Sequence, residues 1–355
     1  MSKSTADTAL MNVEYRRMSD IEPVPVKWLW PGRFARGKFS IIAGNPGVGK
    51  SQIISSMAAI VTVGGLWPDG KRCEPGNVII LSAEDDPADT IRPRLDAVGA
   101  DVRRVFTLDA VIGDTGRRAF NLTDDLSRLA QMIKEIGGAA LIAIDPLTAY
   151  LGRSESYRTA DIRALLSPVG DLAAKHDASI IGVSHLTKGG GDVLTCITGS
   201  FAFVAAPRAV YLVVNKADDQ KCRLFLPLKC NIGSDTTGLA FTVEPQNLPG
   251  GIETSSVIWQ ANPVTVTVEE AMLPQGNPEK RSALGDAKQF LVNLLADGLV
   301  LTVKIQEEAK AANIAWRTIQ RAQKSLNIKP CKVGMDEGWS WQLPPKATKN
   351  HEQCQ

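Results

Sequence analysis

Residues 44–51, GNPGVGKS, fit the phosphate-binding pattern G-x-x-x-x-G-K-[ST]. The glycines allow backbone N–H groups to turn toward a phosphate, and the Lys50 ammonium can reach its β and γ oxygens. The Ser51 hydroxyl is the kind of ligand that Mg²⁺ takes in such loops. The pattern predicts a site for ATP and Mg²⁺ built from Gly44, Asn45, Pro46, Gly47, Val48, Gly49, Lys50, Ser51 and Gln52.

Three further polar side chains each end a run of apolar residues. Asp145 ends ALIAID, Glu84 ends NVIILSAE and His185 ends ASIIGVSH. We expect Asp145 to hold a magnesium-bound water, Glu84 to polarise the attacking water, and His185 to contact the γ-phosphate. The alternatives are that the carboxylates cap turns and that the histidine faces solvent.

Six apolar runs would position these residues. They are 39–44, 77–84, 140–145, 178–185, 209–214 and 222–229. Amphipathic segments separate them, and Asp86 and Pro87 provide a helix start, so that Asp85 and Asp86 are expected to serve that helix. Continuous apolar strands alternating with helices predict an α/β fold with a mostly parallel sheet covered on both faces. The polar NKADDQKC before the last run indicates that the sheet ends antiparallel.

The chain has 355 residues, enough for two domains. We predict a flexible leader at 1–18, a P-loop domain at 19–262, a linker at 263–282, a second domain at 283–345 and a disordered tail at 346–355. The second domain has the pattern of three helices and an aromatic hairpin, as in a winged-helix or helix-turn-helix domain. Its third helix would expose Trp316, Arg317, Gln320, Arg321 and Lys324, while Trp339 and Trp341 would belong to its core.

Overall composition excludes several classes of protein. The net charge is 40 − 38 = +2, which is incompatible with a polycationic nucleic-acid coat. The six cysteines are scattered, so neither a zinc site nor a disulfide framework is expected. The amino-terminal segment has no signal-peptide core, and no apolar run is long enough to span a membrane. We therefore expect a soluble cytoplasmic protein that does not interact with membranes.

The sequence resembles the RepA-type branch of the superfamily-four hexameric helicases, which serve plasmids, phages and mobile elements. The resemblance covers about 20–260 and lies in GNPGVGKS, SAEDD, ALIAIDPLTAYLG, GVSHLTKGGG, TGSFAFVAAPRAV and LPLKCNIG. It implies a RecA-like core, a homo-hexameric ring and ATP-driven movement on single-stranded DNA. It assigns Lys50 and Ser51 to Walker A, Asp145 to Walker B, Glu84 to catalysis and His185 to a sensor.

The resemblance also implies that Lys229 reaches the γ-phosphate of a neighbouring subunit. A related pattern has an arginine two residues later, where this chain has Asn231, so Arg208 or Arg223 could supply a second cation. Loops facing the ring's pore would bring Arg153, Arg158 and Lys188 to single-stranded DNA. Alternatively, each of these residues belongs to an ordinary solvated loop.

Three functions are compatible with these patterns. The first is a ring-forming DNA helicase or translocase in replication of a plasmid, phage or integrated element. Its carboxyl-terminal domain would bind duplex origin DNA or dock to protein, and a primase or initiator would be a separate chain. The second is an ATPase switch that regulates or loads without unwinding. A small-molecule kinase is the third, but it needs an arginine-rich lid that this sequence lacks.

Overall fold

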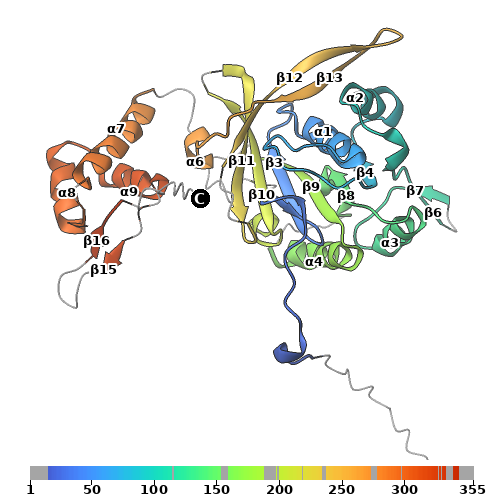
Figure 1. Cartoon of the computed structure of the whole chain (residues 1–355), viewed down its shortest axis with the longest axis horizontal. Coiled ribbons are helices and arrows are strands. Elements are labelled where there is room, and N and C mark those ends of the chain that lie inside the picture. The colour runs from blue at the N-terminus through green and yellow to red at the C-terminus, as the bar shows by residue number, and fades with distance from the viewer. Residues whose placement is uncertain are drawn as a thin grey trace, which may run out of the picture.

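A computed structural model describes most of the chain. It covers residues 15–113, 116–152, 159–187, 197, 200–217, 219–233, 237–272, 278–296, 298–326, 328, 330–332 and 339–343. Figure 1 shows a large α/β body and, beyond it, a smaller group of helices near the carboxyl terminus. No helix in these ranges is both long and apolar enough to cross a membrane.

The body is built on a nine-stranded sheet with the order β13-β12-β11-β10-β3-β9-β8-β4-β5. Strands β10, β3, β9, β8, β4 and β5 run parallel, whereas β11, β12 and β13 continue the sheet antiparallel. Their bounds are β3 Phe39–Gly44, β4 Val78–Ser82, β5 Val105–Thr107, β8 Leu141–Asp145, β9 Ser179–His185, β10 Ala209–Lys216, β11 Asp219–Cys230, β12 Leu239–Leu248 and β13 Ile252–Trp259. The predicted α/β class and the antiparallel end of the sheet are thus confirmed.

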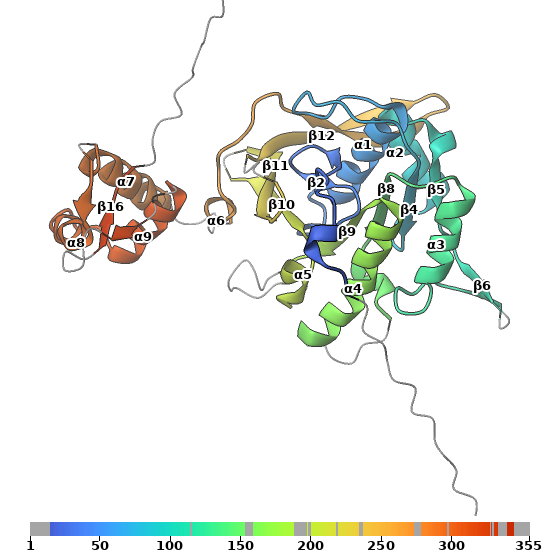
Figure 2. The ribbon, with the colours of Figure 1, turned by 60° about the horizontal axis from the view of Figure 1, so that its bottom comes forward.

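Helices cover both faces of the sheet (Figure 2). One face packs on α1 (Lys50–Val63) and α2 (Arg92–Ala97), and the other packs on α3 (Leu126–Glu135), α4 (Thr159–His176) and α5 (Ala202–Ala205). Side chains of a strand point alternately to the two faces, so in β3 Ile41 joins one core and Ile42 the other. This double burial explains why the parallel strands are continuous apolar runs.

Short elements complete the body. They are η1 Met18–Asp20, β1 Trp28–Trp30, β2 Phe34–Ala35, η2 Pro87–Ile91, η3 Val102–Arg104, β6 Val111–Gly113, β7 Gly116–Arg118 and η4 Leu147–Tyr150. The β12–β13 hairpin extends over α1 and α2 (Figure 1). Trp259 of β13 donates its indole N–H to the Ser56 hydroxyl, 3.1 Å away, and so ties this hairpin to α1.

The carboxyl-terminal unit has its own core. It contains α7 Pro278–Leu294, β14 Val300–Leu301, α8 Thr302–Ala311, α9 Trp316–Ser325, β15 Cys331–Lys332 and β16 Trp339–Trp341. The three strands form an antiparallel sheet in the order β14-β16-β15. Leu291, Ile305, Ile319 and Trp341 are buried together between the helices and this sheet.

Two tryptophans of this unit lie differently from the expectation. Trp316 is half-buried and stacks on Trp341 with ring centroids 5.5 Å apart, because it begins α9 beside the core. Trp339 is 56% exposed, so only Trp341 of the β16 pair belongs to the core. In β16 the first residue, Trp339, is exposed, and the two that follow, Ser340 and Trp341, are buried.

The segment between the two units, which the sequence assigns to a linker, contains a short helix. This helix, α6 (Val268–Ala271), lies between the nine-stranded sheet and α7–α9 (Figure 2). Helix α7 also begins within that segment, at Pro278. The leader, of which residues 15–18 are described, is exposed there.

Candidate functional site

The P-loop connects β3 to α1 at the carboxyl edge of the parallel strands. Gly47 and Gly49 adopt left-handed backbone angles, φ 76° and 93°, which favour glycine. No heavy atom outside the immediate chain neighbours lies within 4 Å of where a Gly47 Cβ would stand, so the loop is open there. The loop therefore has the shape and the space that a phosphate group requires.

Lys50 lies at the start of α1 with its side chain folded back over the loop. Its Nζ donates to the carbonyl oxygens of Gly44 at 2.9 Å and Asn45 at 2.8 Å. Burial lowers the pKa of Lys50, while the charges of Asp145 and Glu84 oppose this shift. The ammonium is thus held in place at the phosphate loop by backbone acceptors.

The two expected magnesium ligands are in direct contact. Ser51 donates its hydroxyl to Asp145 Oδ2 over 2.6 Å. Asp145 is 7% exposed, and burial raises the pKa of its carboxyl, although the Ser51 hydrogen bond opposes that rise. A hydroxyl and a carboxylate side by side next to a phosphate loop are suitable oxygen donors for Mg²⁺, directly or through water.

Glu84 and His185 complete the group at this edge. His185 is the register partner of Gly44, and its Nδ1 lies 3.3 Å from Lys50 Nζ. Its Nε2 lies 3.7 Å from Glu84 Oε1, and the Glu84 side chain is 63% exposed. The structure therefore brings Lys50, Ser51, Glu84, Asp145 and His185 together from four different strand ends.

The acidic neighbours of Glu84 serve the next helix, as expected. Asp86 accepts hydrogen bonds from the Ala88 and Asp89 N–H groups at 2.7 and 3.3 Å and so caps η2. Asp85 pairs with Arg94 of α2, with 2.5 Å between Oδ2 and Nη1. Of these three acids, Glu84 is the one that contacts His185 at the phosphate loop.

Gln52 and Val48 are turned away from the open side of the loop. The Gln52 amide lies 2.7 Å from Ser255 Oγ of β13, and Gln52 is 7% exposed. Val48 is 4% exposed and packs into the core under α1. Their side chains anchor the loop to the sheet, while their backbone remains part of it.

Arg223 belongs to this edge of the sheet. It pairs with Asn215 near the end of β10, and its Cδ lies 3.8 Å from where a Gly49 Cβ would stand. Its Nε is buried without a hydrogen-bond partner in the described part of the chain. The sequence gives no signal that Arg223 lies beside Gly49, because this contact arises from the pairing of β11 with β10 and β12.

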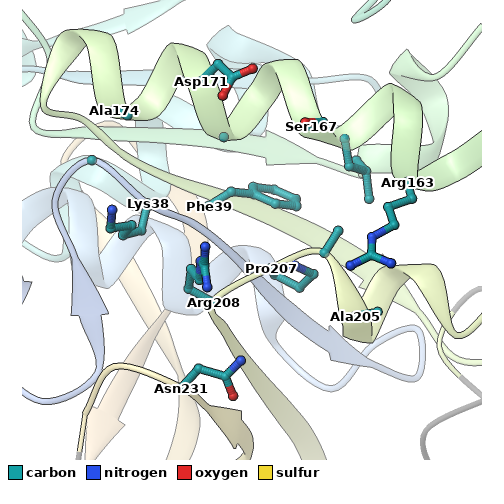
Figure 3. Close-up of a pocket in the computed structure, with 14 residues that line it drawn as sticks. Lys38, Phe39, Arg163, Ser167, Asp171, Ala174, Ala205, Pro207, Arg208 and Asn231 are labelled. Atoms are coloured by element: carbon teal, nitrogen blue, oxygen red, sulfur yellow. The ribbon is translucent and has the colours of Figure 1, made fainter. Parts of the chain in front are cut away.

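A second group of cations lies at the opposite, amino-terminal edge. A cavity of about 360 Å³ there is lined by Lys38 before β3, Arg163 of α4 and Arg208 before β10, with Asp171 as its acidic residue (Figure 3). Within the described ranges, the three cationic side chains make no hydrogen bond or ion pair. The length of β3, roughly 17 Å, separates this cavity from the chain's own P-loop.

Lys229 lies next to this cavity and is fully engaged. Its Nζ donates to the carbonyl oxygens of Val204, Ala205 and Pro207 at 2.8, 3.0 and 2.8 Å. Burial lowers its pKa, and the charges of Arg208 and Arg163 lower it further. Lys229 therefore fixes the end of α5 and the segment that leads to Arg208.

The predicted DNA-binding residues fall into two groups. Arg153, Arg158 and Lys188 lie outside the described residues. Arg317, Gln320, Arg321 and Lys324 are exposed on one side of α9, opposite the buried Ile319 and Ala322. That side of α9 has the predicted cationic character.

Comparison with known families identifies the body of the chain. A family model described as an AAA domain matches residues 5–191, which is more than half of the chain. The chain belongs to this AAA domain family. The match includes the P-loop, Glu84, Asp145 and His185, so the AAA domain contains the clustered site residues up to β9.

The AAA domain protein is also similar to a solved structure whose title describes an ATPase domain. The two chains share 13% identity with a TM-score of 0.44, and the similarity covers 64% of this chain and 85% of that chain. No curated protein matches this chain. The family match and the confirmed α/β sheet with a P-loop identify a nucleotide-binding P-loop ATPase domain.

Proposed function

We propose that the protein is a ring-forming, ATP-dependent DNA helicase or translocase of the RepA type. It would act on single-stranded DNA in the replication of a plasmid, phage or integrated element. The observation that supports it best is the position of His185 between Lys50 and Glu84 at the end of β9. The loop predicted to contact DNA begins two residues later, so a change at the γ-phosphate has a short path to that loop.

The chain's residues divide the work of hydrolysis in this proposal. Lys50 holds the β and γ oxygens, and Glu84, the most exposed of the clustered groups, orients the attacking water and accepts its proton. His185 contacts both and registers whether the γ-phosphate is present. Mg²⁺, held by Ser51 and Asp145, would neutralise phosphate charge when bound.

A neighbouring copy would supply the remaining cation. In a ring of like subunits every interface is head-to-tail, so the amino edge of one copy can meet the P-loop of the next. Arg208 is available for this contact, whereas Lys229 holds the backbone that leads to Arg208. Arg223 would act on the nucleotide of its own chain, since it lies beside Gly49.

The carboxyl-terminal unit would be a winged-helix domain that binds duplex DNA. The order of helix, strand, two helices and two strands supports this assignment, as does the exposed cationic side of α9. Helix α9 would enter the major groove, with Arg317, Gln320, Arg321 and Lys324 toward the bases and phosphates.

The test is ATP turnover with and without single-stranded DNA, together with the mass of the particle under each condition. A motor should be stimulated severalfold and should have the mass of a multimeric ring. An ATPase switch that loads or regulates would turn over equally with and without the strand. Turnover by a monomer that ignores DNA would contradict the proposal.

A further inference from the structure

The side of α9 that is proposed to bind DNA faces the ATPase body. Arg317, Gln320, Arg321 and Lys324 line one cavity of about 750 Å³ together with Thr267, Glu269 and Glu270 of the α6 segment. Three cationic side chains thus share a cleft with two glutamates. Within the described ranges, none of these four α9 side chains makes a hydrogen bond or ion pair.

Helix α6 is anchored in the ATPase body. Val268 is 3% exposed and belongs to the same core as Val210 and Leu212 of β10 and Leu226 of β11. Ala271, the last residue of α6, and Met272, which follows it, also pack against that core. A residue on the opposite side of α6 is therefore held at a fixed position relative to the ATPase sheet.

Glu270 makes that contact with the carboxyl-terminal unit. Its Oε2 accepts from the Thr267 N–H at 3.0 Å, which closes a capping box and fixes the side chain. Its Oε1 accepts from Ser325 Oγ of α9 at 3.0 Å and from Lys288 Nζ of α7. Burial opposes the charged form, but the Lys288 and Thr267 hydrogen bonds hold the pKa of Glu270 below its usual range.

This arrangement and DNA binding exclude each other. A major groove is about 12 Å wide, close to the diameter of a helix with its side chains. Helix α9 cannot enter such a groove while α6 lies against the same side. Glu269 and Glu270 would also repel the phosphates that line the groove.

We propose that α6 is a latch, in which Glu270 holds α9 against the ATPase body and is displaced when α9 binds duplex DNA. The inference rests on the proposed DNA-binding role of α9. It adds that duplex binding releases α6 from α9. Because α6 is packed on β10 and β11, this release is coupled to the part of the sheet near Arg208 and Lys229.

The experiment measures duplex affinity of the full-length chain and its latch variants at fixed salt. Glu270→Gln keeps the side chain's shape but weakens its hold on Lys288, and should raise affinity about fivefold. Ser325→Ala removes one hydrogen bond without changing any charge, and should raise affinity about threefold. Glu253→Gln on the β12–β13 hairpin is the control for net charge and should change affinity by less than about twofold.

A double-mutant cycle separates a latch from a general charge effect. Arg321→Ala should cost more affinity when Glu270 is already Gln, because the face is then open. Hydrogen exchange at residues 267–271 should rise when duplex DNA binds to the unaltered chain. Circular dichroism verifies that each variant is folded. If Glu270→Gln does not fold, Ser325→Ala still tests the latch.

Two results would overturn the latch. If Arg321→Ala weakens binding while both latch variants bind like the unaltered chain, the face is already open. If Arg321→Ala has no effect in either background, α9 is not a DNA-binding helix and the latch fails with that assignment. Stimulation of turnover by single-stranded DNA tests the motor separately in the same preparations.

Discussion

The two edges of the parallel sheet hold their cations in opposite ways. At the carboxyl edge, Lys50 contacts two backbone carbonyls and His185 of the same chain. At the amino edge, Lys38, Arg163 and Arg208 line a cavity without any partner in the described ranges. The cation at the first edge is therefore bonded within its own chain, whereas the cations at the second edge are available to another molecule.

The positions of two further cations agree with this contrast between the edges. Lys229 and Arg223 belong to the same strand, β11. They lie at opposite edges because β11 is long enough to reach from one edge to the other. Arg223 is a neighbour of its own P-loop, and Lys229 is a neighbour of Arg208. If this division is correct, substitutions at the two edges should affect ATP binding and turnover differently.

Lys50→Ala should have the largest effect. It removes the cation that meets the β and γ oxygens, so the Kd for ATP should rise by roughly 10²–10³-fold and turnover should be lost. Calorimetric titration with a non-hydrolysable ATP analogue measures this directly. Lys175→Ala, on the exposed side of α4, is the control, and equal affinities of the two variants would refute the assignment of the P-loop.

Arg208→Ala should lower turnover about 10³-fold without weakening nucleotide binding, if Arg208 acts on the phosphates of a neighbouring copy as proposed. Mixing it with Glu84→Gln chains should restore part of the activity, since an intact site can then face an intact arginine. Lys229→Ala should behave like a milder Arg208→Ala, because it loosens the segment that leads to Arg208. Failure of every mixing ratio in confirmed assemblies would remove the trans role.

Glu84→Gln should bind ATP normally and hydrolyse it about 10²–10³-fold more slowly, because an amide cannot accept the proton of the attacking water. Single-turnover assays separate this loss from product release. Glu74→Gln, an exposed residue before β4, is the matched control. Normal hydrolysis by Glu84→Gln would assign the water-activating role to another residue.

Arg223→Ala should have the smallest effect of the four. The Arg223 side chain lies beside Gly49, and its Nε has no hydrogen-bond partner among the described residues. We expect it to contact the nucleotide of the same chain, so the Kd for ATP should rise about tenfold. Mixing with Glu84→Gln should give no rescue beyond dilution, in contrast to Arg208→Ala. Arg104→Ala serves as the control, and rescue of Arg223→Ala by mixing would place it in trans instead.

The sequence predicts those parts of the fold in which one local pattern decides the structure. The six apolar runs correspond to the strands β3, β4, β8, β9, β10 and β11, as expected, and Glu84, Asp145 and His185 converge because parallel strands end at the same edge. The sequence pattern does not predict β12 and β13. Polar residues, Thr242, Glu244 and Gln246, alternate with others in β12, which is only partly buried. Their pairing is set by β11 and by α1, not by their own composition.

The parts of the site that could not be predicted depend on contacts between distant segments. Nothing around Lys229 in the sequence reveals that the carbonyls of α5 and the following residues take all its donors. The same holds for Trp316, which begins a cationic helix yet stacks on Trp341 from the last strand. The contact of Glu270 with Ser325 likewise joins residues 55 positions apart.

The β12–β13 hairpin is joined by side-chain contacts to α1, the helix that follows the P-loop. Ser255, midway along β13, contacts Gln52 of α1, and Trp259, at the end of β13, contacts Ser56, while the turn at Gly250 and Gly251 lies beyond both contacts. Because both contacts lie in the first turns of α1, we expect a displacement of α1 to move the hairpin with it. A fluorophore at that exposed turn would therefore follow nucleotide occupancy in real time, without touching either edge of the sheet.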